Sequence, residues 1–262
     1  MDTQRLRALV AYDGAPFHGF AANDGVRTVA GDLASALTTI LGADVAITCA
    51  GRTDKGVHGW GQVISFDAPA DHIPLDDLQR ALNHHCRPAI VVRAIEAAPE
   101  GFDARFDATA RIYRYRILNA AVADPFRGAT HWHVADALDL ASLRVGVDPL
   151  LGEHDFSAFC RRATPGPDGR ERTLVRRVER AHWRVRGDVL TFEIEASSFC
   201  QQMVRAIAGT LVDVGRGRRP AAEVGAVLAA RDRSLAGRLA PPHGLMLWRV
   251  RYQEEPGWMA SV

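Results

Sequence analysis

Hydrophobic and polar positions in the first hundred residues follow two periods, one typical of strands and one typical of helices. Leu6, Ala8 and Val10 alternate with Arg5, Arg7 and Leu9, and this alternation predicts a half-buried strand. Thr28 is a good N-cap and Gly42 a good helix end, so the apolar residues between them predict a helix. The expected elements are strands over residues 6–12, 45–50, 62–66 and 90–95, and helices over 29–41 and 74–82. Their order, β-α-β-β-α-β, is that of ferredoxin-like folds, which RNA-recognition modules also use.

The chain after residue 105 carries a second set of elements. Alternation predicts a long strand over residues 109–118, and two further runs that meet at Gly187-Asp188 predict a β-hairpin. The remaining expectations are helices over residues 138–151, 199–214 and 221–230, and a closing strand over residues 245–252. We therefore divide the chain into an N-terminal domain, residues 1–104, and a C-terminal domain, residues 105–262.

The composition is that of an ordinary globular protein. Hydrophobic residues make up 47% of the 262 residues and charged residues 24%, which excludes disorder as the main state. The sequence has no long apolar run for a membrane span or a signal peptide, so we expect a cytoplasmic protein without a membrane partner. The four cysteines form no C-x-x-C pair, which argues against a disulfide framework and a cysteine-based zinc site.

Positive charge is concentrated in the second part of the chain. Residues 1–100 hold 8 basic and 12 acidic residues, whereas nine arginines and three acidic residues fall between positions 161 and 186. A general preference for arginine over lysine explains the composition but not this clustering. Guanidinium groups suit phosphates and bases. The Pro/Gly/Arg-rich loop over residues 160–172 is therefore a candidate RNA contact through Arg161, Arg162, Arg170 and Arg172.

One segment between two predicted strands combines charged side chains with glycine: A-G-R-T-D-K-G-V-H at residues 50–58. Asp54 stands close to Arg52 and Lys55, and these cations favour an ionised carboxylate. Such a carboxylate can be a nucleophile, a base, or half of a structural salt bridge, and the charge pattern alone favours the salt bridge. Neither glycine fingerprint of a phosphate-binding loop is present.

The same segment resembles the A-G-R-T-D-x-G-V-H signature of the bacterial tRNA pseudouridine synthase A family. Further motifs resemble that family in its own order: Y-D-G at residues 12–14, A-R-F-D-A-T-A-R-I-Y-R-Y at 104–115, G-E-H-D-F-S-A-F at 152–159, M-V-R at 203–205 and A-P-P-H-G-L at 240–245. The resemblance therefore extends over nearly the whole chain.

The resemblance implies an isomerase, an intramolecular transferase that converts uridine to pseudouridine at positions 38–40 of the tRNA anticodon stem-loop. It implies a homodimer that uses no cofactor and no metal. The implied fold is the α+β pseudouridine synthase fold: two ferredoxin-like or RRM-like β-sheet domains packed together, with the catalytic cleft between them. By the same resemblance Asp54 is the catalytic aspartate, Tyr113 lies against the target base, Arg205 pairs with Asp54, and Arg52 lies beside the flipped nucleotide.

The reaction suits these residue types but leaves its route open. A carboxylate can attack C1′ of the ribose, or it can take a proton from C2′ and give a glycal. The target base has to leave its stack at a cost of a few kcal/mol, and an aromatic ring can stack on it. Tyr113 and Tyr115 are two residues apart on a predicted strand and share one face of it. The sequence alone gives equal weight to two core tyrosines and to a contact with the substrate, and the resemblance favours the substrate contact.

The chain departs from the family pattern at three places. Phe20-Ala21 stands where Trp-Gln is usual in the family, and Ala30 stands where a glutamine often follows Thr-Val. H-H-C-R-P-A-I at residues 84–90 replaces a run of the type N-x-x-L-P-x-D-I, of which only Asn83 is retained. We expect these changes at the rim of the site, outside the Asp54 loop, where they would alter tRNA affinity or the choice of site.

Two other classes of function compete with an isomerase. A non-catalytic RNA-binding protein of the same fold would be indicated by loss of Asp54 or Tyr113, and both residues are present. A glycosidase would need a second catalytic carboxylate, which no motif signals. The pairs His84-His85 and His131/His133 do not predict a metal site, because adjacent helical side chains diverge and the second pair has no carboxylate or cysteine near it in sequence.

Overall fold

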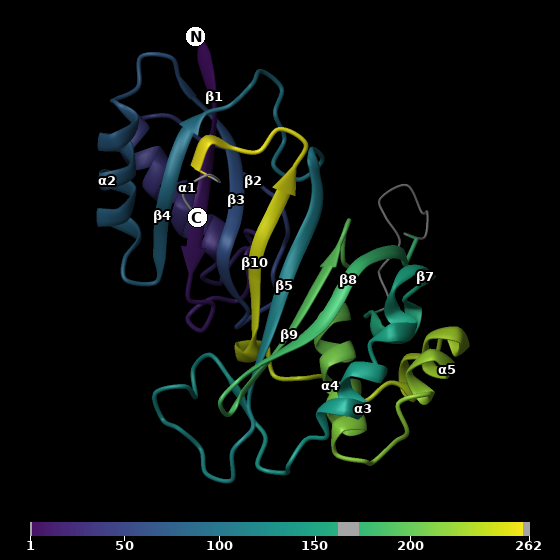
Figure 1. The fold of residues 1–262 in the computed structure, drawn as a ribbon. Coiled ribbons are helices and arrows are strands. Elements are labelled where there is room, and N and C mark those ends of the chain that lie inside the picture. Colours follow the sequence, from purple (N-terminus) through teal and green to yellow (C-terminus); the bar gives the residue numbers. More distant parts are fainter. Residues whose placement is uncertain (1, 162–172, 259–262) are drawn as a thin grey trace. The chain divides into compact units, whose positions relative to one another are not determined.

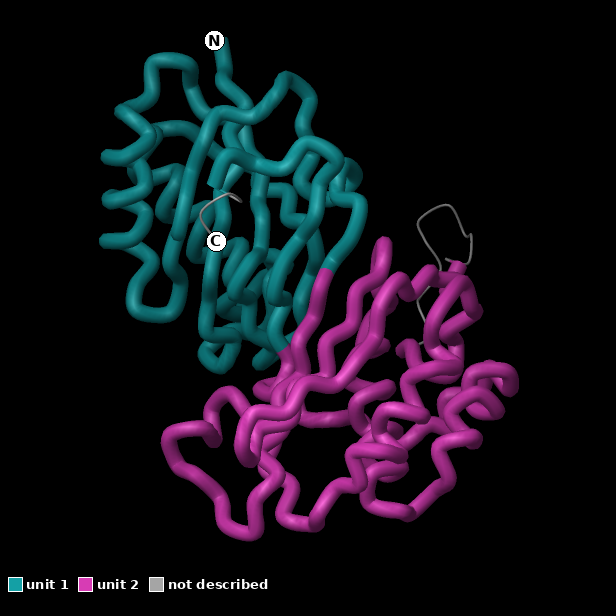
Figure 2. The backbone as a smooth tube through the Cα atoms, viewed as in Figure 1, with its two compact units in different colours: residues 1–111, 246–262 teal, residues 112–245 magenta. Residues whose placement is uncertain are grey.

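The chain forms two compact units, which we describe from a computed structural model for residues 2–161 and 173–258. The first unit comprises residues 1–111 and 246–262, and the second comprises residues 112–245 (Figure 2). The chain passes into the second unit within one strand and returns to the first at its last strand. The first unit therefore includes the C-terminal segment, which the sequence analysis assigned to the second domain.

The first unit is an α+β sandwich with the predicted β-α-β-β-α-β order (Figure 1). Its sheet has the strand order β4-β1-β3-β10, and the short β2 also pairs with β3. β1 is antiparallel to both neighbours, and β10 is parallel to β3. The elements are β1 (Thr3–Tyr12), α1 (Val29–Leu41), β2 (Thr48–Cys49), β3 (His58–Pro69), α2 (Leu75–Cys86), β4 (Ile90–Ala97) and β10 (Leu245–Tyr252).

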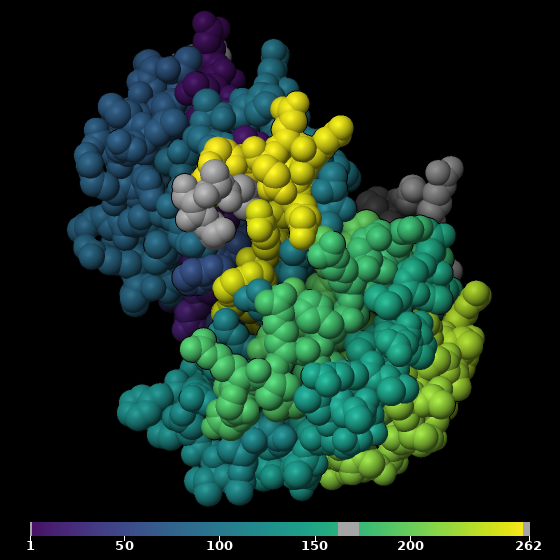
Figure 3. All heavy atoms as spheres, in the orientation of Figure 1, coloured from purple at the N-terminus to yellow at the C-terminus, as the bar shows by residue number. Residues whose placement is uncertain are grey.

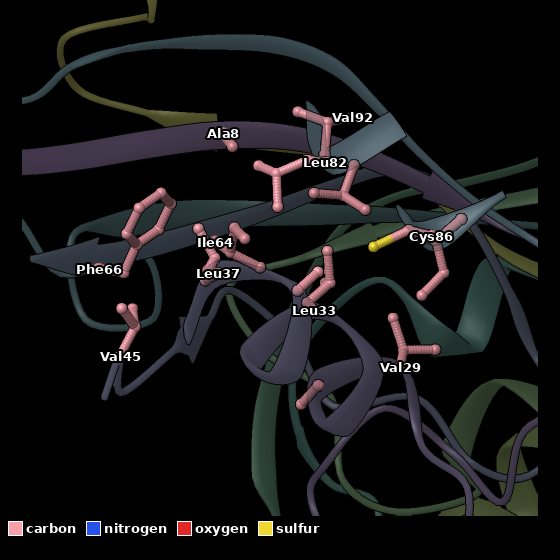
Figure 4. Close-up of a cluster of buried hydrophobic side chains, with 14 of the residues drawn as sticks. Ala8, Val29, Leu33, Leu37, Val45, Ile64, Phe66, Leu82, Cys86 and Val92 are labelled. Carbon is pink, nitrogen blue, oxygen red and sulfur yellow. The ribbon is translucent and has the colours of Figure 1, made fainter. Parts of the chain in front are cut away.

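Helix α1 begins and ends where its caps predict. The Thr28 side chain accepts a hydrogen bond from the N–H of Gly31 at 3.1 Å, and the N–H of Gly42 donates to the carbonyl of Thr38 at 2.9 Å. Leu33 and Leu37 are fully buried between this helix and the sheet (Figure 4). The apolar face of α1 and the inner face of the sheet thus form the core of the first unit.

The C-terminal segment is built into the first unit. The hydroxyl of Tyr252 donates to the carbonyl of Ala104 at 2.8 Å, and its ring lies 5.2 Å from the ring of Phe102. The Arg7 guanidinium lies over Phe102 and over Trp258. Side chains of this segment are at the surface of the unit in the space-filling view (Figure 3). These long-range contacts place β10 beside β3, where local sequence patterns cannot put it.

The second unit consists of a sheet in the strand order β5-β9-β8-β7, with β6 paired to β5, and several helices. The turn of the β8–β9 hairpin lies at Gly187 (φ 59°), as predicted. The elements are β5 (Ala108–Leu118), β6 (Trp132–His133), α3 (Leu140–Val145), β7 (Gly152–Asp155), β8 (Val175–Arg186), β9 (Val189–Ala196), α4 (Met203–Gly215), α5 (Glu223–Ala230) and the short 3₁₀ helices Asp148–Leu150, Ser157–Phe159, Arg233–Leu235 and Pro242–Gly244.

Several element boundaries differ from the predictions. Helix α4 begins four residues later than predicted because Gln202 has a left-handed backbone (φ 67°), which a helix cannot contain. The strand predicted over residues 45–50 is reduced to two residues. The helix predicted over residues 138–151 is divided into α3 and a 3₁₀ turn.

A disulfide joins Cys160 to Cys200, whose Cα atoms are 5.8 Å apart. The absence of a C-x-x-C pair predicts no disulfide framework, and for this one pair the prediction is wrong. The two cysteines are 40 residues apart in sequence, and the fold brings them together because the segment of Arg161 lies beside that of Gln201, whose carbonyl accepts the Arg161 N–H at 2.9 Å.

Candidate active site

Asp54 lies on a tight turn between β2 and β3. The N–H of Val57 donates to the carbonyl of Asp54 at 3.1 Å, and Gly56 closes the turn with a φ of 76°, a conformation that glycine adopts without strain. The Asp54 side chain is half-buried, whereas Arg52 and Lys55 are exposed. The turn therefore presents one carboxylate from a rigid edge of the first unit, with two cations close by in the chain.

The residues before Asp54 are held by side chains from distant parts of the first unit. The Gln62 amide bonds both backbone groups of Gly51, donating to its carbonyl at 2.6 Å and accepting from its N–H at 3.3 Å. The buried Arg111 guanidinium donates to the carbonyl of Ala50 at 2.9 and 3.1 Å. The hydroxyls of Tyr12 and Thr53 lie 2.8 Å apart. Buried hydrogen bonds of this kind fix a backbone, because breaking one leaves an unpaired polar group.

The segment that follows β1 supports the turn from its other side. A Cβ atom on Gly14 would lie 2.1 Å from the carbonyl oxygen of Val57, so only glycine fits there. The N–H of Phe20 donates to the carbonyl of Thr53 at 3.0 Å, and the Phe20 ring is buried. The expected position at the rim is wrong for Phe20, because its ring is buried; Phe20 lies outside residues 50–58 and contacts them through its backbone bond to Thr53.

Tyr113 and Tyr115 lie on β5 in the second unit and have different surroundings. Tyr115 is fully buried and donates its hydroxyl to the carbonyl of Pro241 at 2.8 Å, and burial raises the pKa of Tyr115 far above its usual value. Tyr113 is 7% exposed and packs edge-on against Phe199, with ring centres 5.0 Å apart. Tyr115 is thus a core residue, and Phe199, which the sequence analysis did not single out, orients the ring of Tyr113.

Arg205 lies on α4 in the second unit and is half-buried. Its Nε donates to the carbonyl of Ala240 at 2.8 Å, and the N–H of Ala240 donates back to the carbonyl of Arg205 at 3.2 Å. The positive charge of Arg205 opposes the rise in the pKa of Tyr115. Arg205 is therefore a fixed residue near Tyr115 and not a solvated arginine. Its pairing with Asp54 stays a prediction.

The candidate RNA contacts of the second unit are only partly described. Arg161 is exposed, and its N–H donates to the carbonyl of Gln201. Arg162, Arg170 and Arg172 lie outside the described residues. Within β8, Arg177, Arg180, Arg184 and Arg186 are exposed.

The described ranges, 2–161 and 173–258, contain no group of three or more histidine, cysteine or acidic side chains placed to hold a metal ion. Within those ranges, no helix has the length and apolar character that a membrane crossing requires.

Comparisons with known proteins identify the family. The family model for tRNA pseudouridine synthase matches residues 8–107 and 147–253. The chain is 40% identical to tRNA pseudouridine synthase A of Geobacillus kaustophilus, over 97% of this chain and 96% of that protein. It is 41% identical to the protein of that name from Brevibacillus brevis (95% of this chain, all of that one), and 39% identical to that of Bacillus subtilis (95% and 99%). The chain belongs to the tRNA pseudouridine synthase family.

Proposed function

We propose that this protein isomerises uridine to pseudouridine at positions 38–40 of the anticodon stem-loop of tRNA. The observation that carries the proposal is the Asp54 turn: it presents a half-buried carboxylate, and three strands and the segment after β1 hold the residues before it in place. A rigid carboxylate suits a reaction in which one side chain has to meet one ribose atom, because misplacement of the reacting groups by about 1 Å can cost a factor of about 10² in rate.

The reaction exchanges one glycosidic bond for another. The N1–C1′ bond breaks, the uracil turns over, the C5–C1′ bond forms, and the hydrogen of C5 is replaced by one on N1. No net oxidation or reduction occurs. Asp54 acts in this scheme either as the nucleophile that holds C1′ or as the base that removes the C2′ proton. Tyr113 is proposed to lie against the flipped base and Arg52 beside the flipped nucleotide.

The release of the C5 hydrogen gives a direct test. An unmodified tRNA transcript labelled with tritium at C5 of uridine should release tritium to water when the protein is added. A transcript in which cytidine replaces the uridines at positions 38–40 should release none. Binding of the transcript without any release would contradict the proposal and would favour the non-catalytic RNA-binding protein.

Arg205→Met tests the proposed pairing with Asp54. Methionine keeps much of the apolar length but removes the charge and the planar fork, so we expect turnover to fall at least about 100-fold. Arg205→Lys should recover only part of it, because lysine lacks bidentate geometry. The matched control is Arg238→Met, which removes a second guanidinium that acts on Tyr115. Normal turnover in Arg205→Met would show that Arg205 does not support Asp54.

The arginine-rich loop over residues 160–172 is proposed to contact phosphates of the tRNA. Replacing Arg161, Arg162, Arg170 and Arg172 together by glutamine should weaken tRNA binding and flatten its salt dependence, by about 0.7–0.9 in slope for each lost phosphate contact. Binding titrations at several salt concentrations measure this slope. Glutamine at Arg80 and Arg87 of the first unit is the control. An unchanged slope in the fourfold variant would mean that the loop does not contact the tRNA.

We also propose that the protein acts as a homodimer in the cytoplasm. Exposed apolar side chains on the first unit support self-association: Trp60 is 40% exposed and stacks on Trp248, and Val91 is 42% exposed. Light scattering should give a mass of twice the 28.5 kDa of one chain. A monomer at working concentrations would overturn the homodimer and leave the proposed reaction standing.

A further inference from the structure

Phe106 is an exposed aromatic residue on a well-anchored turn of the first unit. Its exposure is 78%, whereas Phe102 and Ala104 nearby in the chain are buried. A phenylalanine side chain left in water forgoes the favourable free energy of its burial. Burial in the core therefore does not account for a phenylalanine at this position.

The turn that carries Phe106 is held by its own carboxylates. Asp103 accepts hydrogen bonds from the N–H groups of Arg105 at 2.8 Å and Phe106 at 2.9 Å. Asp107 accepts one from the N–H of Asp103 at 2.8 Å. Because these acidic groups bond the backbone of the turn, the side chains of Arg105 and Phe106 are presented from a fixed backbone.

One buried guanidinium links this turn to the Asp54 segment. Arg111 donates to the carbonyl of Arg105 and also to the carbonyl of Ala50, which begins the segment that leads to Asp54. It donates as well to the carbonyl of Ala108 at 2.9 Å. A shift of either segment would cost these bonds, so Arg111 ties the backbone at Arg105 to the backbone at Ala50.

Guanidinium groups lie near Phe106, together with the carboxylates of Asp103 and Asp107 that hold its turn. The Arg105 guanidinium lies over the Phe106 ring, 5.3 Å from its centre. Burial raises the pKa of the Cys49 thiol to about 11, and the charges of Arg52 and Arg105 both oppose this rise. The charges of Arg52 and Arg105 thus both act on this thiol, which lies on the strand that precedes the Asp54 segment.

We propose that Phe106 and Arg105 form a second RNA contact, in which a base near the target uridine stacks on the Phe106 ring and Arg105 holds an adjacent phosphate. An exposed aromatic ring combined with guanidinium groups suits single-stranded nucleic acid, whose bases stack and whose backbone is anionic. The contact rests on the proposed function, because it needs an RNA substrate beside Asp54. It would set where along the RNA the target uridine is placed.

The chain offers a matched control for this proposal. Phe126 is 96% exposed, also on an ordered turn beside an arginine. The neighbouring Arg127, however, is paired with the carboxylates of Asp124 at 3.1 Å and Asp188 at 2.6 Å. Phe126 therefore offers an exposed ring beside an arginine whose guanidinium is paired with carboxylates, and we expect that it does not bind RNA.

The test compares binding of a tRNA anticodon stem-loop to Phe106→Ala, Phe106→Tyr, Phe106→Leu and Phe126→Ala. Loss of one base-stacking contact should raise the Kd about 5- to 100-fold for Phe106→Ala. The tyrosine variant should bind within about twofold of wild type, the leucine variant should resemble alanine, and Phe126→Ala should bind normally. The kcat of Phe126→Ala at saturating RNA should stay within about twofold of wild type.

A spectroscopic readout separates stacking from a general effect on the fold. An RNA with 2-aminopurine placed in turn at each nucleotide flanking the target should show quenching at one position with wild type, and not with Phe106→Ala. Normal binding by Phe106→Ala or by Phe106→Leu would overturn the proposal. So would a fall in kcat with unchanged Kd. Wild-type protein that quenches the probe but forms no pseudouridine would overturn the proposed function and not this contact.

Discussion

Asp54→Asn is expected to lower the rate of pseudouridine formation by about 10³-fold or more, with the fold and tRNA binding largely intact. The amide has nearly the shape of the carboxylate but can act neither as nucleophile nor as base. The turn itself should survive, because it is closed by the backbone bond between Val57 and Asp54, and Gln62, Arg111 and Tyr12 hold the residues before it.

Single-turnover kinetics and a tRNA binding titration on Asp54→Asn measure the two quantities separately. The thermal midpoint controls for folding. A rate within tenfold of wild type would remove Asp54 from the chemistry, and the turn would then have a structural role only.

Gly14→Ala is expected to reduce turnover about 100-fold without touching a charged group. Its new Cβ would lie 2.1 Å from the carbonyl oxygen of Val57, so one of the two backbone segments has to move. Val57 closes the Asp54 turn, and a displacement of about 1 Å at a reacting group can cost about 10² in rate.

The control for this substitution is Gly128→Ala, because a Cβ on Gly128 meets its nearest neighbour only at 3.8 Å. The ratio of kcat between Gly14→Ala and Gly128→Ala, at similar thermal stability, isolates the effect of the displaced turn. Equal kcat values would show that the position of Val57 does not govern the reaction.

Local sequence patterns were sufficient to predict most helices and strands of the first unit. The caps of α1 at Thr28 and Gly42 depend on residues within four positions of the helix, so the sequence shows them directly. The Asp54 segment was found for the same reason, because its charges and glycines are contiguous. Only the resemblance distinguished a catalytic Asp54 from a salt bridge.

The contacts that hold the site could not be predicted, because they join residues far apart in the chain. Gln62 and Arg111 read as ordinary strand residues until the fold brings them to Gly51 and Ala50. The place of β10 in the first unit and the disulfide between Cys160 and Cys200 depend in the same way on the return of the chain. No periodicity or spacing records such pairings.

The most direct test of the account is a map of pseudouridine at single-nucleotide resolution in unmodified tRNA transcripts after incubation with the protein. We predict new pseudouridine at positions 38, 39 and 40 where uridine is present, none elsewhere, and none with Asp54→Asn. Pseudouridine confined to other parts of the tRNA, or the same map from Asp54→Asn as from wild type, would contradict it.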